Sequence, residues 1–206
     1  MTVVAAVRDA LLGAFLAMAA LTVRAAVPAS EPGDMTLGSP SAPVEVIEYA
    51  SVGCPHCAAW ANDVLPAFKK QYIDTGQARL VVRIMLTGDP DLAMAGFLLA
   101  RCAGPSRYFD VMDQVYRRQA SMYQPGASPG PILEQIAASA GVGAAAFKAC
   151  MHSHKGFDAV NALNQRHFDQ DKVQLTPTFF VGDKRFEGDV SLAELGEAVR
   201  AAHHGP

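Results

Sequence analysis

The chain has 206 residues, half of them hydrophobic, and a formal net charge of −3 at pH 7. This length is sufficient for one domain with its own hydrophobic core. Acidic and basic residues are interspersed, so the sequence has no basic stripe of the kind that binds nucleic acid. Its four cysteines are typical of a protein in an oxidising compartment if the chain is exported.

The N-terminal segment is predicted to be an export signal. Uncharged and mostly apolar residues 10–23 are followed by small residues, including Ala25 and Ala29. This run is too short for a membrane span, which needs roughly twenty residues, and its length matches a secretory signal. We expect residues 1–29 to be a cleaved signal peptide and 30–206 to be the mature domain. An uncleaved membrane anchor and a wrongly assigned start codon are the alternatives.

The next segments predict an irregular lead-in, a buried strand and a helix. Glu31–Pro43 is rich in Pro, Gly and Ser, whereas Val44–Tyr49 is largely apolar and predicts a strand buried on both faces. The sequence Cys54-Pro55-His56-Cys57 opens a helical pattern that continues to Asp74. Pro66 lies inside this pattern and should kink or split the helix.

The remainder of the chain predicts one α/β domain with a helical insertion at about residues 89–171. Ala78–Leu86 is a second strand, which completes a right-handed βαβ unit. Helical patterns follow without a strand between them, at Asp91–Ala103, Arg107–Arg118, Pro131–Ala140, Gly143–His152 and Lys155–Asp171. Thr178–Val181 and Lys184–Glu187 then predict a hairpin, and Leu192–Ala202 a closing helix.

The two cysteines of the Cys54–Cys57 motif predict a redox site. At a strand-to-helix junction, their spacing lets the sulfurs close a small ring, and a helix N-terminus stabilises a thiolate. Structural cysteines or half of a zinc site are the alternatives, but zinc needs four converging ligands. Cys150, His152 and His154 form a second metal-like pattern, which is more typical of a solvated helix end. We therefore predict no metal.

Position in the motif predicts a role for each residue. Cys54, at the helix start, is expected to be the low-pKa nucleophile, and Cys57, one turn further in, the buried partner that resolves the mixed disulfide. Pro55 occupies a position where a missing N–H costs nothing. His56 is expected to stabilise the Cys54 thiolate by its dipole or charge, which would make the disulfide form a strong oxidant.

Glu48 and Pro177 are further site candidates. Glu48 is either an outward-facing edge residue or a buried proton acceptor with a raised pKa that helps Cys57 ionise, and we favour the second interpretation. Pro177 is either an ordinary trans proline before a strand or a cis proline beside the cysteines. We favour the cis form, which would expose the backbone of Thr176 to a bound polypeptide.

Cys102 and Cys150 lie near the ends of predicted helices. An even number of cysteines and export favour a structural disulfide between them, and two unpaired buried thiols are the alternative. The bridge would close a loop of about fifty residues, which stabilises the fold by a few kcal/mol in the loop-entropy model.

These motifs together resemble the DsbA-type thiol:disulfide interchange proteins of the thioredoxin superfamily. The resemblance rests on Cys54–Cys57 after Val46–Ser51, on Thr176–Val181 and on the helices between them, and it covers about residues 34–203. It implies a thioredoxin fold with an inserted helical domain, a periplasmic location in a Gram-negative bacterium, and oxidation of reduced exported polypeptides. It also implies reoxidation by a membrane quinone-linked thiol oxidase, and we expect no cofactor.

The sequence departs from this family at Thr176, where the best-known DsbA has Val and where disulfide isomerases have Thr. An isomerase or reductase of the same superfamily is therefore the second hypothesis. A protein that binds unfolded chains or a metal such as copper through Cys54 and Cys57 is the third. Because Glu31–Pro43 is too short for the dimerisation segment of such isomerases, we expect a monomer.

Overall fold

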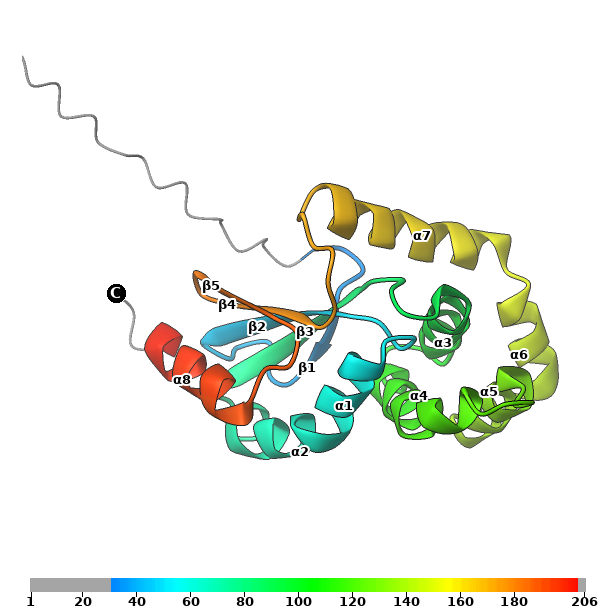
Figure 1. The fold of residues 1–206 in the computed structure, drawn as a ribbon, viewed down its shortest axis with the longest axis horizontal. Helices are drawn as coiled ribbons and strands as arrows, with labels where there is room; N and C mark the ends of the chain where they lie inside the picture. The colour runs from blue at the N-terminus through cyan, green and yellow to red at the C-terminus, as the bar shows by residue number, and fades with distance from the viewer. Residues whose placement is uncertain (1–30, 204–206) are drawn as a thin grey trace, which may run out of the picture.

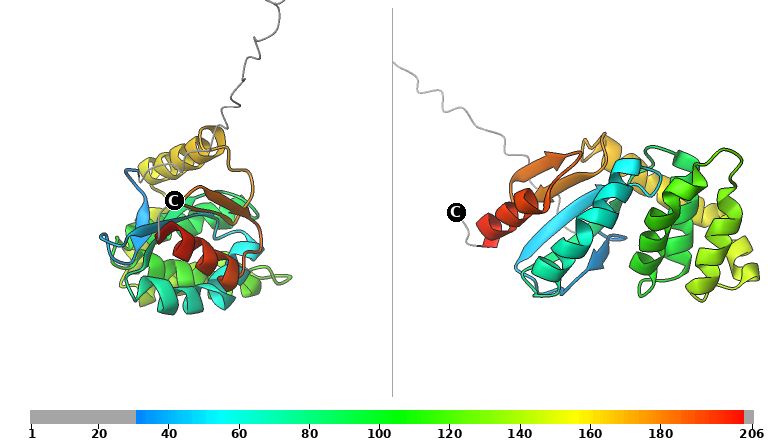
Figure 2. Two further views of the ribbon diagram at one scale, coloured as in Figure 1. Left: turned by 90° about the vertical axis from the view of Figure 1, so that its left-hand side faces the viewer. Right: turned by 60° about the horizontal axis from the view of Figure 1, so that its bottom comes forward.

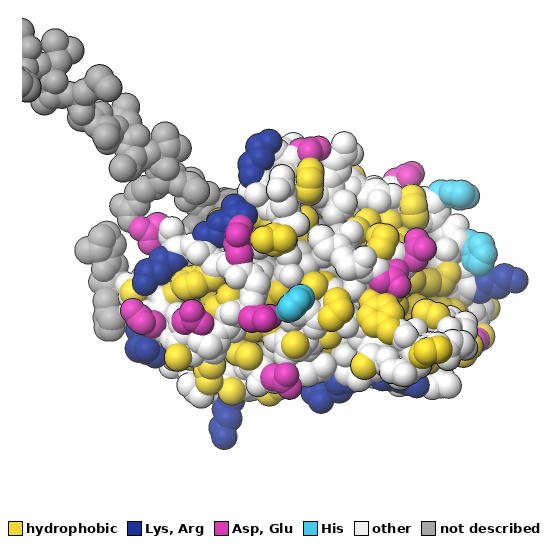
Figure 3. Space-filling model, in the orientation of Figure 1, with side chains coloured by type: hydrophobic (Ala, Val, Ile, Leu, Met, Phe, Trp, Pro, Cys, Tyr) yellow, Lys and Arg dark blue, Asp and Glu magenta, His cyan; other side chains and the backbone are white. Residues whose placement is uncertain are grey.

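The structure, a computed structural model, describes residues 31–203. The predicted signal peptide at residues 1–29 lies outside this range. Within residues 31–203, the structure has no helix of the length and apolar character that spanning a membrane requires. On the face shown in Figure 3, cationic and anionic side chains are interspersed with hydrophobic ones, in agreement with the composition.

A five-stranded mixed sheet forms the centre of the fold (Figure 1), in the order β1-β3-β2-β4-β5. The strands are β1 (Met35–Leu37), β2 (Val44–Ala50), β3 (Ala78–Ile84), β4 (Thr178–Val181) and β5 (Lys184–Glu187). β2 and β3 are parallel, as a βαβ unit requires, and the remaining neighbours are antiparallel. The central strand β2 is buried along almost its whole length, which agrees with its apolar sequence.

The short edge strand β1 corrects the prediction of an irregular lead-in. Met35 pairs with Val82, and Leu37 pairs with Leu80, in an antiparallel ladder with β3. The strand has three residues in a segment rich in Pro, Gly and Ser, so local composition conceals it. Its conformation depends on hydrogen bonds to a strand about forty residues later in the sequence.

The helix after the cysteine motif is interrupted. The predicted continuous pattern consists of α1 (Pro55–Asp63), α2 (Leu65–Phe68) and a π-helical turn, η1 (Lys69–Ile73). The interruption at Val64 lies two residues before Pro66, whose missing N–H and ring disfavour an unbroken helix. The prediction that Pro66 splits the helix is therefore confirmed.

Five helices lie between β3 and β4, and we call them the helical block. They are α3 (Pro90–Cys102), α4 (Tyr108–Met122), α5 (Pro129–Ser139), α6 (Ala144–Met151) and α7 (His154–Asp169). α3 to α6 lie beside the sheet, next to the end of β2 that leads into α1 (Figure 2, right), and α4 packs against α1. α7 crosses back over β3. The fold is thus a thioredoxin-like α/β domain with a helical insertion.

The closing helix α8 (Leu192–His203) packs against α2, β2 and β4. With α1 and α2 it covers one face of the sheet, and α7 lies on the other (Figure 1). Residues that face α1, α2 and α8 belong to the large core, whereas Ile47, Tyr49, Val81 and Phe180 belong to a smaller cluster. Successive side chains of a strand point to opposite faces of the sheet. Glu48 therefore points away from the smaller cluster and towards α1 and α4.

Cys102 and Cys150 are joined by a disulfide, with 6.3 Å between their Cα atoms. The bond connects the last residue of α3 to α6, which are otherwise separated by two helices in the sequence. Because Cys150 is in this disulfide, the zinc interpretation of Cys150, His152 and His154 fails. Across residues 31–203, no group of three or more His, Cys, Asp or Glu side chains could hold a metal ion.

Candidate active site

Cys54 and Cys57 lie where β2 passes into α1. Cys54 is the N-cap residue of α1, with φ −97° and ψ 122°, and Pro55 is the first residue of the helix. Both cysteines are free thiols. Cys54 retains 6% of its surface exposed, whereas Cys57 has 0%. A reagent from solvent therefore reaches Cys54 first.

Hydrogen bonds place both sulfurs against backbone groups. The Cys54 Sγ lies 3.3 Å from the carbonyl oxygen of Thr176, and the backbone N–H of Ser51 donates to the Cys57 Sγ at 3.4 Å. The Thr176–Pro177 peptide bond is cis. The segment before β4 is thereby in direct contact with the first cysteine, although 122 residues separate Cys54 from Thr176.

The environment lowers the pKa of Cys54 to about 5. The largest cause is a hydrogen bond from the Cys57 thiol, followed, among those that lower it, by the Thr176 side chain and the backbone N–H groups of Cys57 and His56, while burial opposes them. The pKa of Cys57 is raised well above its ordinary value, first by burial and then by Cys54 and Glu48. At neutral pH, the pair therefore holds one thiolate, on Cys54.

His56 is exposed, and its Nδ1 lies 2.9 Å from Oδ1 of Asp189. This hydrogen bond and the carboxylate charge raise the pKa of His56, and the charge of Cys54 raises it further. The hydrogen bond from His56 that lowers the Cys54 pKa comes from its backbone N–H rather than from its ring. Asp189 is in the segment between β5 and α8, and no local pattern in the sequence predicts this partner.

Glu48 is buried in β2, with 3% of its surface exposed, and is paired with Val82 of β3 and Phe179 of β4. Burial raises the pKa of Glu48 to about 8. Burial accounts for this shift, and no hydrogen bond is among its causes. The charge of Glu48 is one of the causes that raise the pKa of Cys57, so ionisation of Glu48 makes ionisation of Cys57 less favourable.

Gln119 of α4 is a site residue that the sequence did not reveal. Its side chain is buried, and its Nε2 donates to the carbonyl of Val52 at 2.7 Å and to that of Cys54 at 3.2 Å. The hydroxyl of Tyr123 donates to the carbonyl between them, that of Gly53, at 2.8 Å. The one available signal is its position, because Gln119 interrupts the apolar stripe of α4 at helical spacing from Val115.

The loop before Cys54 also touches the loop after β3. The N–H of Asp89 donates to the Gly53 carbonyl at 3.0 Å, and Ser51 donates its hydroxyl hydrogen to the Thr87 carbonyl at 2.8 Å. Gly88 has φ +72°, and a Cβ there would overlap the carbonyl of Gly53. A residue with a side chain is therefore excluded at Gly88 on two grounds, strain and space.

Comparison with known proteins agrees with this architecture. Residues 30–201 match the thioredoxin family. A Rickettsia typhi protein described as "Putative protein-disulfide oxidoreductase" is 32% identical over 169 residues, which are 82% of this chain and 62% of that protein. Disulfide bond formation protein D of Bacillus subtilis is 24% identical over 180 residues, covering 81% of this chain and 76% of that protein.

Among solved structures, α-DsbA1 of Wolbachia pipientis is similar, with a TM-score of 0.76 and 26% sequence identity. The similarity covers 85% of this chain and 93% of that one. The chain thus spans about three fifths of the length of the rickettsial relative but nearly all of the Wolbachia structure. The described fold and the placement of its helices correspond to a DsbA-type protein.

Proposed function

Because this chain belongs to the thioredoxin family, we propose that it is a DsbA-type thiol-disulfide oxidoreductase that introduces disulfides into exported proteins. The observation that carries the proposal is the asymmetry of the cysteine pair, in which the pKa of Cys54 is about 5 and that of Cys57 is raised. Stabilising the Cys54 thiolate stabilises the reduced pair, and a pair that is stable when reduced is oxidising as a disulfide.

In the proposed reaction, the Cys54–Cys57 disulfide accepts two electrons from a substrate dithiol. A substrate thiolate attacks the Cys54 sulfur, a bond forms between them, and the Cys54–Cys57 bond breaks with Cys57 leaving as a thiolate. The second substrate thiolate then attacks the substrate sulfur of the mixed disulfide. Cys54 leaves as a thiolate, which its hydrogen bonds stabilise, and the substrate carries the new disulfide.

Glu48 would supply the proton that the leaving Cys57 needs. The Cys57 thiolate forms in a fully buried position, where an uncompensated charge is costly. Glu48 is itself buried and has a pKa of about 8, so at neutral pH it carries a proton that it can release to Cys57. In the reverse direction, the Glu48 carboxylate would take the proton as Cys57 attacks.

Thr176 and Pro177 would bind the substrate backbone. The Thr176 carbonyl already lies 3.3 Å from the Cys54 sulfur, so a peptide that pairs with Thr176 would bring its own cysteine to the same position. Main-chain pairing of this kind tolerates many sequences, as an enzyme with varied substrates requires. The substrate would thus be an extended, reduced segment of an exported chain.

The proposed location is the periplasm, after removal of residues 1–29, with a membrane quinone-linked thiol oxidase as the partner that regenerates the disulfide. The protein would act as a monomer and without a cofactor. An isomerase or reductase remains the second candidate. The specific feature that favours it is Thr176, whose hydroxyl forms a hydrogen bond with that of Thr87.

The test uses Cys54→Ser and measures the oxidative refolding of reduced ribonuclease by the oxidised protein. We expect the variant to lose at least about a thousandfold in rate, because Cys57 alone cannot form the Cys54–Cys57 disulfide that accepts the electrons. A double variant, Cys102→Ser with Cys150→Ser, is the matched control and should retain the activity. Refolding that survives Cys54→Ser would contradict the enzyme proposal.

The equilibrium with glutathione separates oxidase from reductase. We expect a reduction potential well above that of thioredoxin, which is about −270 mV, because of the low pKa of Cys54. A potential near the thioredoxin value would instead favour the reductase. The Thr176→Val variant then tests whether the threonine accounts for the difference.

A further inference from the structure

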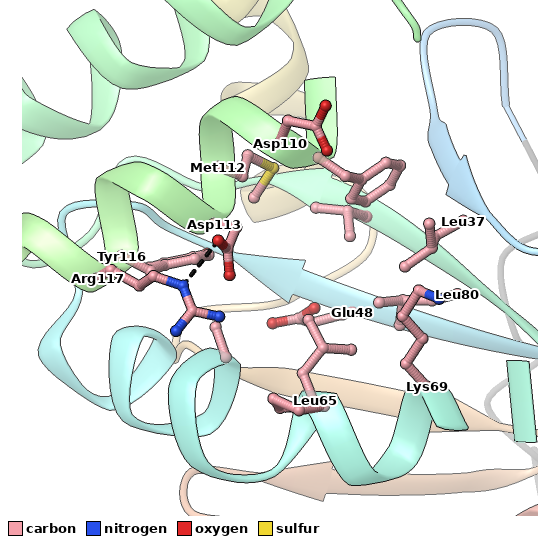
Figure 4. A pocket seen from close by; sticks show the side chains of 14 residues that line it. Leu37, Glu48, Leu65, Lys69, Leu80, Asp110, Met112, Asp113, Tyr116 and Arg117 are labelled. Atoms are coloured by element: carbon pink, nitrogen blue, oxygen red, sulfur yellow. Dashed lines mark hydrogen bonds and ion pairs between the residues drawn. The ribbon is translucent and has the colours of Figure 1, made fainter. Parts of the chain in front are cut away.

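A cavity of about 280 Å³ lies between the sheet, α1–α2 and α4. Its walls are mostly apolar and include Leu65, Leu80 and Met112, which come from all three sides (Figure 4). Phe109 of α4 is a further apolar lining residue. Neither Cys54 nor Cys57 is among the lining residues. The cavity is therefore separate from the surface at which a substrate thiol meets Cys54.

Two buried polar residues line this cavity. The Glu48 carboxyl points into it (Figure 4), and the raised pKa of this group comes from burial, with no hydrogen bond among its causes. Tyr116 lines the same cavity, and its buried hydroxyl has no hydrogen-bond partner in the described part of the chain. Buried polar groups normally have a hydrogen-bond partner. The missing partner is therefore expected to come from a molecule inside the cavity.

The charged residues at the exposed edge of the cavity are already paired. Arg117 Nε lies 2.8 Å from Asp113 Oδ2, and Arg107 Nη1 lies 3.2 Å from Asp110 Oδ2. Lys69 is paired with Asp74, outside the cavity. Of the acidic residues that line the cavity, Asp110 and Asp113 are thus paired with arginines, and the negative charge of ionised Glu48 is not compensated by these pairs. A cation or a strong hydrogen-bond donor would compensate it, and an anion would be repelled.

We propose that this cavity binds a small amphiphilic amine, with its apolar body against Leu65, Phe109 and Met112 and its ammonium group on Glu48. The volume is close to the lower end of the range for ligand pockets, about 300 to 1,000 Å³, so the ligand is a small molecule. The apolar body of the ligand would pack against the apolar walls of the cavity, with which water forms no hydrogen bonds. The ammonium group donates to the Glu48 carboxylate and to the Tyr116 oxygen.

Binding should depend on pH, since an ammonium group favours the ionised form of Glu48. The titratable and charged groups that face Glu48 are Cys57 of α1, Lys69 of η1, and a set from α4 that consists of Tyr108, Asp110, Asp113, Tyr116 and Arg117. With the pKa of Glu48 at about 8, amine binding near neutral pH releases a proton. Affinity therefore rises between about pH 6 and about pH 8.5, where an alkylammonium stays charged.

The test compares 2-phenylethylammonium with 2-phenylethanol, which has the same apolar body and no charge, by isothermal titration calorimetry on the reduced protein. At about pH 8.5 we expect the ammonium ion to bind at least about tenfold more tightly. Titration in two buffers of different ionisation enthalpy should show proton release at neutral pH. This experiment measures binding alone, so its result does not depend on whether the redox function is correct.

Glu48→Gln should remove both the preference for the ammonium ion and the proton release. Glu45→Gln is the matched control, because Glu45 is on the same strand but pairs with Arg79 outside the cavity, and it should leave binding unchanged. Equal affinity for the two probes, unchanged binding in Glu48→Gln, or no saturable binding of the ammonium ion would each overturn the proposal.

Discussion

The two cysteine pairs of this chain have the same chemical groups and opposite structural settings. Cys54 and Cys57 are three positions apart at the start of α1 and are free thiols. Cys102 and Cys150 are 48 positions apart, form a disulfide and connect α3 to α6. A bond within the first pair would close only a short ring, whereas the bond of the second pair closes a long loop.

The difference shows that reactivity comes from neighbours rather than from sulfur itself. The Cys54 sulfur is surrounded by hydrogen-bond donors, and a buried acid faces Cys57. Cys102 and Cys150 lie in the helical block, away from Glu48, Thr176 and the Ser51 N–H. A thiolate on either would lack the stabilisation that lowers the pKa of Cys54. The two pairs are therefore expected to respond independently to substitution.

The largest expected effect on stability comes from removing the second pair. Cys102→Ser with Cys150→Ser should lower the free energy of unfolding by about 4 kcal/mol, because the 48-residue separation gives a large loop-closure entropy. Urea denaturation measures this loss. The pKa of Cys54, followed by thiolate absorbance, should stay near 5. A shift in that pKa would show that the two pairs are coupled.

Glu48→Gln tests the buried acid that lies beside the first cysteine pair, Cys54 and Cys57. The folded pKa of Glu48, about 8, lies above its ordinary value of 4.5, so the folded state holds a proton that the unfolded chain releases. Its contribution to stability is complete below pH 4.5 and is lost as the pH rises to about 8. We expect the difference in unfolding free energy between the variant and the wild type to grow over this window, with an upper limit of about 5 kcal/mol.

Denaturation curves at several pH values measure that difference. If the difference were constant from acidic to alkaline pH, Glu48 would not have a raised pKa. In the proposed reaction, the same substitution should also slow the release of Cys57, because no neighbouring group would donate the proton. The Cys102–Cys150 disulfide should be unaffected in both experiments.

Gln119→Met tests how the helical block supports the first pair. The substitution keeps the length of the side chain but removes the donor to the carbonyls of Val52 and Cys54. Leaving buried acceptors unpaired should cost about 1 to 3 kcal/mol of stability. It should also raise the pKa of Cys54, since the loop that positions Cys54 against its hydrogen-bond donors in α1 would be less well held.

Tyr123→Phe is the comparison variant for Gln119→Met, because Tyr123 donates to the neighbouring Gly53 carbonyl from a more exposed position. Its effect on stability and on the pKa of Cys54 should be smaller. An unchanged Cys54 pKa in Gln119→Met, together with the expected loss of stability, would make Gln119 a structural residue only.

The smallest effect is expected from Asp189→Asn. The carboxylate of Asp189 raises the pKa of His56, so the variant should lower that pKa towards its ordinary value, as measured by NMR titration of the imidazole. Because both side chains are exposed and exposed ion pairs are weak, the refolding rate should change by less than about threefold. A larger change would mean that the His56 ring, and not only its N–H, controls Cys54.

Local sequence patterns predicted most of the fold. The apolar β2, the cysteine motif at a strand-to-helix junction and the five helices between β3 and β4 all have local signatures. The strand β1 does not, since its three residues become a strand only by pairing with β3. Pro66 indicated a helix break, but the position of the break at Val64 depends on packing.

The reactive residues of the candidate site could be predicted from the sequence, whereas the residues that hold them in place could not. Cys54, Cys57 and Glu48 were identified because their residue types are unusual at those positions of the sequence. Gln119 and Asp189 were not, since 65 residues separate Cys54 from the first and 133 separate His56 from the second. Contacts between such distant segments depend on how the helical block and the β5–α8 segment fold back, which no local pattern encodes.

The contact between Gly53 and Gly88 has a mechanical consequence. Asp89 caps α3 with its side chain and holds the Gly53 carbonyl with its N–H, and the two glycines leave no space between their backbones. At this junction, the start of the helical block and the loop before Cys54 form a fixed joint. If the block shifts when a polypeptide binds, the loop before Cys54 is expected to shift with it, so that docking on the block would be transmitted to the reactive sulfur.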